Sequence, residues 1–161
     1  MNQVTTRRVI KPKDGVQPVE PHVRPSSAPS DALQPKVKPQ TTLWTAWLER
    51  FAKVEQFSAG LAQEAERIKA KPLHADVAEA RRLQDTYLTP WNELVETFDA
   101  AAGAEVPPGL RADYGRYLEL RTGLVRALIR RCLAPHGGSI LQLDAALAAL
   151  QAFVEARRKQ P

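Results

Sequence analysis

Residues 42–69 read TLWTAWLERFAKVEQFSAGLAQEAERIK, and the spacing of the apolar side chains in this stretch decides the fold. The apolar line alternates in steps of three and four residues over nearly four heptads, through Trp44, Trp47, Phe51, Val54, Ser58, Leu61, Ala65 and Ile68. This spacing places one face of an α-helix against neighbouring helices. Thr41 or Thr42 is expected to cap the helix, and Pro72 to end it, because the residue before a proline is pushed out of the helical conformation.

Three further segments with helical apolar spacing follow along the chain. They cover residues 73–102, 107–133 and 140–158. The apolar phase of the first passes through Pro90 unchanged, so we expect either a kink or two abutting helices at this proline. Four amphipathic helices joined by short connections predict an all-α fold, an up-down-up-down four-helix bundle.

Local signals refine the third and fourth helices. Gly115 and Gly123 lie inside the third helix, where each costs about 1 kcal/mol relative to alanine, and we expect a closely approaching neighbour to be the reason for them. Ser139 and Gln142 have the spacing of a capping box. The fourth helix is therefore expected to begin near Ile140.

Residues 1–40 differ sharply in composition from residues 41–161. They hold seven of the 13 prolines, none of the aromatic residues, and seven basic against three acidic residues. Residues 41–161 hold 16 basic and 15 acidic residues, so the pI of about 9.6 is mostly a property of the first segment. Frequent proline blocks helix and sheet, and few large apolar side chains can offset the entropy of ordering. We expect a disordered, proline-rich basic tail over 1–40 and one helical domain over 41–161.

Composition also limits the class of protein. The single cysteine, Cys132, excludes a disulfide framework. Arg7 and Arg8 are followed by Pro12, not by an apolar stretch, so we expect no export signal and a cytoplasmic location, with the Ala and Arg content typical of a GC-rich bacterial genome. Because no stretch approaches about 20 apolar residues, we also expect no membrane span.

The sequence shows no constellation typical of catalysis. A di-iron bundle site needs Glu-x-x-His pairs, and the chain has none. Cys132 and His136 have metal-ligand spacing, but no second pair of ligands accompanies them. A helix N-terminus beside Arg130, Arg131 and His136 is a candidate anion site, with a glycine hinge and a capped helix as the competing interpretation. We therefore predict that the protein is not an enzyme and has no catalytic residue, metal or cofactor.

The candidate partner-binding residues fall in three places. They are Arg7, Arg8, Val9, Ile10 and Lys11 in the tail, Trp44 and Trp47 at the start of the first helix, and Arg126 and Arg130 on the third. The tail motif mixes basic and β-branched residues, which suits a sheet edge or a groove, although nonspecific attraction to an acidic surface explains it equally. Tryptophan anchors interfaces, but core packing accounts better for at least one of the pair. The two arginines share a helix face, which is either solvated or a site for phosphates or an acidic protein.

These observations favour a noncatalytic protein–protein interaction or assembly subunit. The bundle would dock or oligomerise, and the tail would be a tether that orders on a partner protein, with self-association of the chain also expected. One alternative is a nucleic-acid-associated protein that uses the tail and the third-helix arginines; it is less favoured because steps of five residues fan most of the arginines around the helix. A second alternative is a small-ligand or enzyme site inside the bundle, for which Gln84, Ser58 and Arg121 are the polar candidates.

Overall fold

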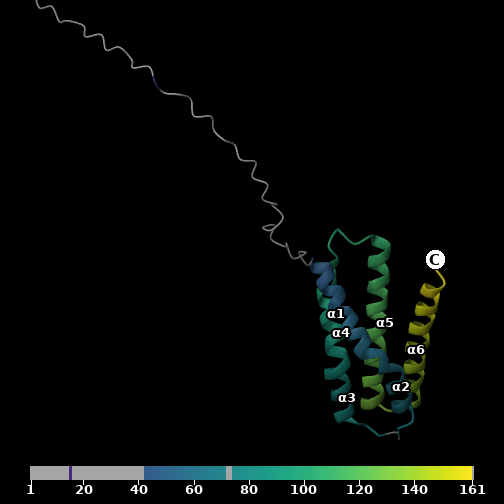
Figure 1. Cartoon of the computed structure of the whole chain (residues 1–161). Coiled ribbons are helices and arrows are strands. Elements are labelled where there is room, and N and C mark those ends of the chain that lie inside the picture. Colours follow the sequence, from purple (N-terminus) through teal and green to yellow (C-terminus); the bar gives the residue numbers. More distant parts are fainter. Residues whose placement is uncertain (1–14, 16–41, 72–73, 161) are drawn as a thin grey trace, which may run out of the picture. The chain divides into compact units, whose positions relative to one another are not determined.

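The structure, a computed structural model, describes Gly15 and residues 42–71 and 74–160. The all-α class is confirmed for these residues, whose elements are α1 (Leu43–Phe57), η2 (Ser58–Gly60), α2 (Leu61–Lys69), α3 (Val77–Leu83), η3 (Gln84–Leu88), α4 (Thr89–Ala102), α5 (Pro108–Leu133) and α6 (Gly137–Arg158). The helices lie side by side, with α5 in contact with both α4 and α6 (Figure 1). The predicted disordered tail over 1–40 lies outside the described residues, Gly15 excepted.

The first predicted helix contains a tightened turn. α1, η2 and α2 follow one another without a gap, and η2 is a 3-10 turn that begins at Ser58. Ser58 is buried, and its Oγ accepts a hydrogen bond of 2.8 Å from the indole Nε1 of Trp91. The apolar spacing predicted one uninterrupted helix, because spacing along the sequence does not show that Ser58 accepts a hydrogen bond from a side chain of another helix.

The second predicted helix contains a π-helical turn in front of Pro90. α3, η3 and α4 are continuous, and η3 is the π-helical turn. The backbone N–H of Thr89 donates to the carbonyl oxygen of Gln84, and so does its Oγ1 at 3.1 Å. A wider turn accommodates a proline ring that would otherwise clash with the preceding turn. The helix therefore passes Pro90 without dividing into two.

Near the start of α1, the core contains an aromatic cluster that joins α1, α4 and α5. Its members are Trp44, Trp47, Phe51, Phe98 and Tyr114, and the contacting rings have centroids 5.1–6.3 Å apart. Trp47 is only 2% exposed, and its Nε1 donates to the backbone oxygen of Leu94 at 3.1 Å. Burying an indole together with a partner for its N–H is the favourable arrangement for tryptophan.

The start of α6 differs from the prediction. The N-cap is His136, whose Nδ1 accepts a hydrogen bond of 3.2 Å from the backbone N–H of Ser139. The Ser139 Oγ accepts in turn from the His136 N–H at 3.2 Å. The predicted capping box of Ser139 and Gln142 is therefore wrong. An imidazole nitrogen fulfils the role that sequence rules reserve for hydroxyl and carboxylate oxygens, and α6 begins at Gly137.

The expected reason for the two glycines of α5 is also wrong. A Cβ added at Gly115 would lie 3.8 Å from a ring carbon of Phe98, which is ordinary van der Waals contact. A Cβ added at Gly123 would meet nothing within 4 Å. Neither glycine is therefore required by a closely approaching helix, and Gly123 faces open space.

The expectation that no segment could span a membrane is contradicted by α6. The helix has 22 residues, and an 18-residue window within it reaches a mean hydropathy of 1.3 with few charged residues, so it is long and apolar enough to cross a bilayer. Only 17% of that window is buried in the protein. The prediction counted the large apolar residues at heptad positions. The alanines between them, such as Ala145, Ala148 and Ala149, also raise the hydropathy of the helix.

Candidate docking groove

A groove of about 430 Å³ runs between α5 and α6. Its lining residues are Arg116, Glu119, Leu120, Gly123, Arg126, Ala127 and Arg130 from α5, with Gln142 and Ala146 from α6. The α5 members follow one another in steps of three and one, so they occupy a single face of the helix. The groove therefore contains Arg126 and Arg130, the two helix residues predicted to share a binding face.

Arg126 and Arg130 are exposed, and their partners among the described residues are neutral. Arg126 Nη2 donates to Asn92 Oδ1 at 3.4 Å, and Arg130 Nη1 donates to Gln142 Oε1 at 3.0 Å. Neither arginine takes part in an ion pair within residues 42–71 and 74–160. Their charges remain uncompensated, and a guanidinium group in this state suits a carboxylate or phosphate.

The sequence reasoning missed a third arginine of the groove. Arg116 lies on the same face, and its Nη1 donates to Glu119 Oε2 at 2.6 Å. The separation of 14 residues from Arg130 is two heptads, a signal that would have placed both on one face. The prediction compared arginines about five residues apart, which point in different directions, and so did not show that Arg116 and Arg130 share a face.

Apolar residues and a glycine complete the groove. Leu120, Ala127 and Ala146 contribute apolar surface, and Gly123 adds none of its own. Because a Cβ at Gly123 would meet nothing within 4 Å, the missing side chain leaves room at this point of the groove. The arrangement combines positive charge with an apolar surface.

The other predicted partner-binding residues lie elsewhere. Trp47 is buried in the aromatic cluster, and Trp44 is half-buried and stacked on it, with centroids 5.1 Å apart and an interplanar angle of 7°. The structure therefore places Trp47 in the core, leaving it little surface for a partner. Arg7, Arg8, Val9, Ile10 and Lys11 lie outside the described residues.

The three polar residues considered for a site inside the bundle are not gathered in one place. Ser58 is bonded to Trp91, and Gln84 is exposed in the π turn. Arg121 pairs with Glu55, and its Nε donates to the hydroxyl of Tyr117 at 2.9 Å.

Arg121 and its partners lie beside a second cavity. Glu55 and Tyr117 help to line this cavity of about 320 Å³, in which Asp113 also pairs with Arg157. Burial and the hydrogen bond to Glu55 raise the pKa of Tyr117. The polar groups of this second cavity are thus largely engaged with one another, unlike Arg126 and Arg130.

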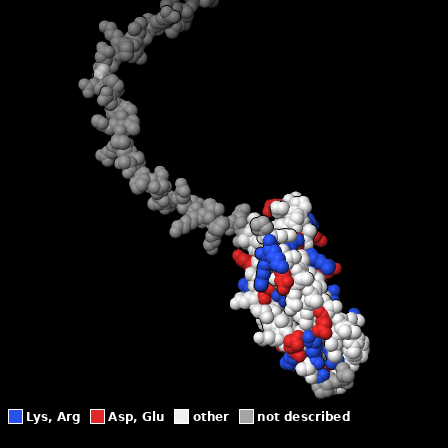
Figure 2. Space-filling view, turned by 90° about the vertical axis from the view of Figure 1, so that its right-hand side faces the viewer, with Lys and Arg blue, Asp and Glu red and all other residues white. Residues whose placement is uncertain are grey.

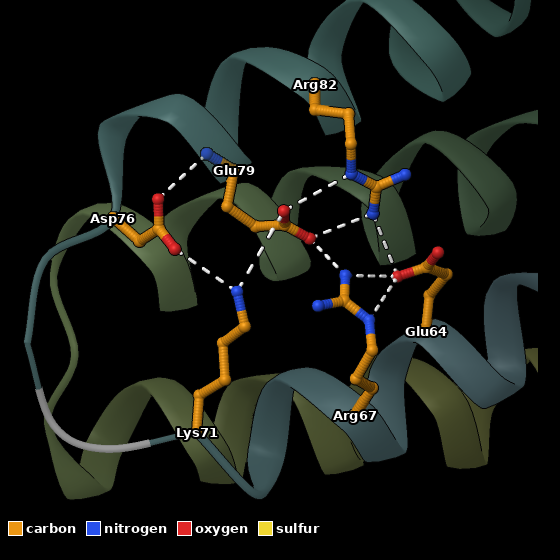
Figure 3. Close-up of polar contacts among 6 residues, drawn as sticks. All are labelled: Glu64, Arg67, Lys71, Asp76, Glu79 and Arg82. Carbon is orange, nitrogen blue, oxygen red and sulfur yellow. Dashed lines mark hydrogen bonds and ion pairs between the residues drawn. The ribbon is translucent and has the colours of Figure 1, made fainter.

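A charged network at the opposite end from the aromatic cluster was not predicted at all. It consists of Glu64, Arg67, Lys71, Asp76, Glu79 and Arg82 (Figure 3). Hydrogen bonds from Arg82 and Arg67 lower the pKa of Glu79 to about 2. The pKa of Asp76 is also lowered, first by the backbone N–H of Glu79 and then by Lys71. These pairs connect the end of α2 and the following segment with the start of α3.

Neither metal-binding geometry nor similarity to known proteins supplies a function. Within residues 42–71 and 74–160, no three His, Cys, Asp or Glu side chains are grouped to hold a metal ion. No family model matches the chain, and the comparisons with curated proteins and with solved structures returned no match. The function is therefore inferred from the geometry of the chain itself.

Proposed function

We propose that this protein is a noncatalytic interaction or assembly subunit. In this proposal the helices form an up-down-up-down four-helix bundle, and residues 1–40 are a tether that orders on a partner. The groove between α5 and α6 takes an acidic, amphipathic segment of a partner protein. Carboxylates of that segment would contact the arginines, and its apolar side chains would cover the groove surface.

The single observation that carries the proposal is the state of Arg126 and Arg130. Both guanidinium groups are exposed beside an apolar surface, and both have neutral amides as partners. A carboxylate can accept two parallel hydrogen bonds from one guanidinium group and also carries the opposite charge, whereas an amide oxygen is neutral. Replacement of these amides by carboxylates would therefore be favourable.

The apolar part of the groove supports a protein partner over a nucleic acid. A phosphate backbone would use the three arginines but would leave Leu120, Ala127 and Ala146 without apolar contacts. Residues 41–161 are also nearly balanced in charge, with 16 basic and 15 acidic residues. Nucleic-acid binding is typically driven by a stronger excess of positive charge.

A charge reversal tests the proposal. The double variant Arg126→Glu/Arg130→Glu in the full chain should lose a captured partner protein, with affinity reduced by at least about tenfold. Arg81→Glu/Arg158→Glu is the matched control, because both arginines are exposed and neither is ion-paired within residues 42–71 and 74–160. Calorimetric titration with the purified partner measures both affinities.

The outcomes separate the hypotheses. Equal loss in both double variants would indicate a general charge effect and would contradict docking in the groove. Capture of nucleic acid alone, with affinity falling steeply as salt rises, would favour the nucleic-acid alternative.

Gly123 offers a charge-neutral version of the same test. Gly123→Leu should fill the groove and abolish partner binding, whereas Gly123→Ala should raise the free energy of unfolding by about 1 kcal/mol. Because a Cβ at this position meets nothing within 4 Å, both variants should fold. Full partner binding by a folded Gly123→Leu variant would show that the groove is not the docking site.

One observation on α6 favours a second candidate function, attachment to a lipid bilayer. The exposed residues of this helix include Leu141, Ala145, Ala148, Ala149 and Ala152. Figure 2 views the α6 side, and uncharged residues cover much of the surface there. Flotation of the full chain with phosphatidylcholine–phosphatidylglycerol vesicles tests this: flotation that Ala148→Glu abolishes supports it, and protein remaining at the bottom of the gradient removes it.

A further inference from the structure

Arg131 is a buried arginine without a counter-charge among the described residues. The residue is only 2% exposed, near the end of α5, and its Nε and Nη1 have no hydrogen-bond partner in the part of the chain that the structure describes. Arg131 also takes part in none of the ion pairs within the described ranges 42–71 and 74–160. An arginine keeps its charge in a protein interior, and removing one charged partner from a buried pair costs about 3–5 kcal/mol.

The neighbouring charged network has no charge to spare for Arg131. Glu64 and Glu79 are shared by Arg67 and Arg82, and Asp76 is paired with Lys71 at 3.1 Å (Figure 3). Three carboxylates thus face three cationic side chains, and the network is neutral by itself. The charge of Arg131 is an additional positive charge at this end of the helices.

A small cavity lies beside this charge. It measures about 10 Å³ and is lined by Ile68, Lys71, His74, Asp76, Arg131 and Cys132. A cavity needs about 10–15 Å³ to hold one water-sized species. The space therefore admits a monatomic ion or a water molecule and is too small for phosphate or an organic acid.

We infer that this cavity binds one small monovalent inorganic anion, of the size of chloride, with Arg131 as its principal ligand. The ion supplies the counter-charge that Arg131 lacks among the described residues. Lys71 also lines the cavity, but Asp76 in the same lining matches its charge, so the Arg131 guanidinium is the uncompensated group there. A water molecule fits the same space and accepts hydrogen bonds, but it leaves the buried charge uncompensated. This site is separate from the docking groove and independent of the proposed function.

Thermal unfolding of the full chain tests the inference. Sodium chloride and sodium gluconate are compared at equal ionic strength, so that general screening is the same, and gluconate is too large to enter the cavity. Chloride should raise the Tm by roughly 4 °C when it stands about tenfold above its Kd. Equal Tm values in the two salts at every concentration would overturn the inference.

Two variants assign the effect to this arginine. Arg131→Met removes the charge and keeps an apolar stem, and it should abolish the difference between chloride and gluconate. Arg158→Met removes an exposed arginine of α6 that lines neither the groove nor this cavity, and it should keep the full difference. A chloride effect that persists in a folded Arg131→Met variant would overturn the inference.

A second measurement does not depend on the variant folding. Crystals of the wild-type chain soaked in sodium bromide should show an anomalous-scattering peak within hydrogen-bonding distance of the Arg131 guanidinium. Density for water without an anomalous signal at that position would contradict the anion site.

Discussion

The aromatic cluster and the charged network both connect the segment from α1 to α2 with the segment from α3 to α4, but by different physical means. In the cluster, rings from α1, α4 and α5 pack with centroids 5.1–6.3 Å apart. In the network, α2 and α3 are connected through ion pairs whose arginines, Arg67 and Arg82, remain 45% and 40% exposed. Apolar burial stabilises in proportion to area, whereas partly exposed ion pairs contribute little and respond to pH and salt. The cluster should therefore dominate the free energy of unfolding, and the network its dependence on conditions.

The largest expected effect comes from removing an indole from the cluster. Trp47→Ala should lower the free energy of unfolding by about 3–5 kcal/mol, because it removes a fully packed side chain together with the hydrogen bond from its Nε1 to the Leu94 carbonyl. Urea denaturation measures the change. Leu43→Ala on the same helix is the control, since Leu43 is 73% exposed and its loss should change stability by less than about 0.5 kcal/mol.

The two variants also show how the comparison could fail. If Trp47→Ala and Leu43→Ala destabilised the protein equally, the cluster would not be the main source of stability. The network would then have to supply more than exposed ion pairs usually do.

The cluster was predictable from the sequence, and the network was not. Apolar spacing is a local property, so steps of three and four residues placed Trp44, Trp47 and Phe51 on one face before any partner was known. Ion pairs such as Arg82–Glu64 join residues of different helices, and local spacing does not show which charges will meet. For the same reason the 3-10 turn at Ser58, which is bonded to a distant tryptophan, could not be foreseen.

The candidate groove was predictable only in part. Helical periodicity correctly aligned Arg126 with Arg130, but it did not show that α6 would supply Gln142 as a partner for one of them. Arg131 is the opposite case. It follows Arg130 directly and looks the same in sequence, yet the helix turns it inward to 2% exposure, because adjacent residues point about 100° apart.

A smaller effect is expected from the centre of the network. The pKa of Glu79 is lowered from 4.5 to about 2, so its carboxylate stabilises the folded state above the unfolded pKa. This contribution is lost as the pH falls from about 5 toward 2. Glu79→Gln should cost about 1–2 kcal/mol at pH 7, less than the full pKa shift implies because its arginine partners are partly exposed to solvent.

Denaturation curves at several pH values measure this dependence. Glu79→Gln should flatten the loss of stability between pH 5 and pH 2, whereas Glu66→Gln, whose carboxylate is 70% exposed, should leave the wild-type profile unchanged. A profile that Glu79→Gln does not alter would show that another carboxylate controls the acid response.

The smallest effect is expected from an isolated ion pair located in the same half as the aromatic cluster. Arg50 and Glu93 are 3.6 Å apart, with side chains 50% and 60% exposed, and no third charge joins them among residues 42–71 and 74–160. Arg50→Met should change the free energy of unfolding by less than about 0.5 kcal/mol, because solvent screens such a pair and ordering two long side chains opposes it. Urea denaturation at low and at high salt measures the change. If Arg50→Met lowered the free energy of unfolding as much as Glu79→Gln does, an isolated exposed ion pair would contribute as much as one within the charged network. The number of connected charges would then not determine the contribution of an ion pair.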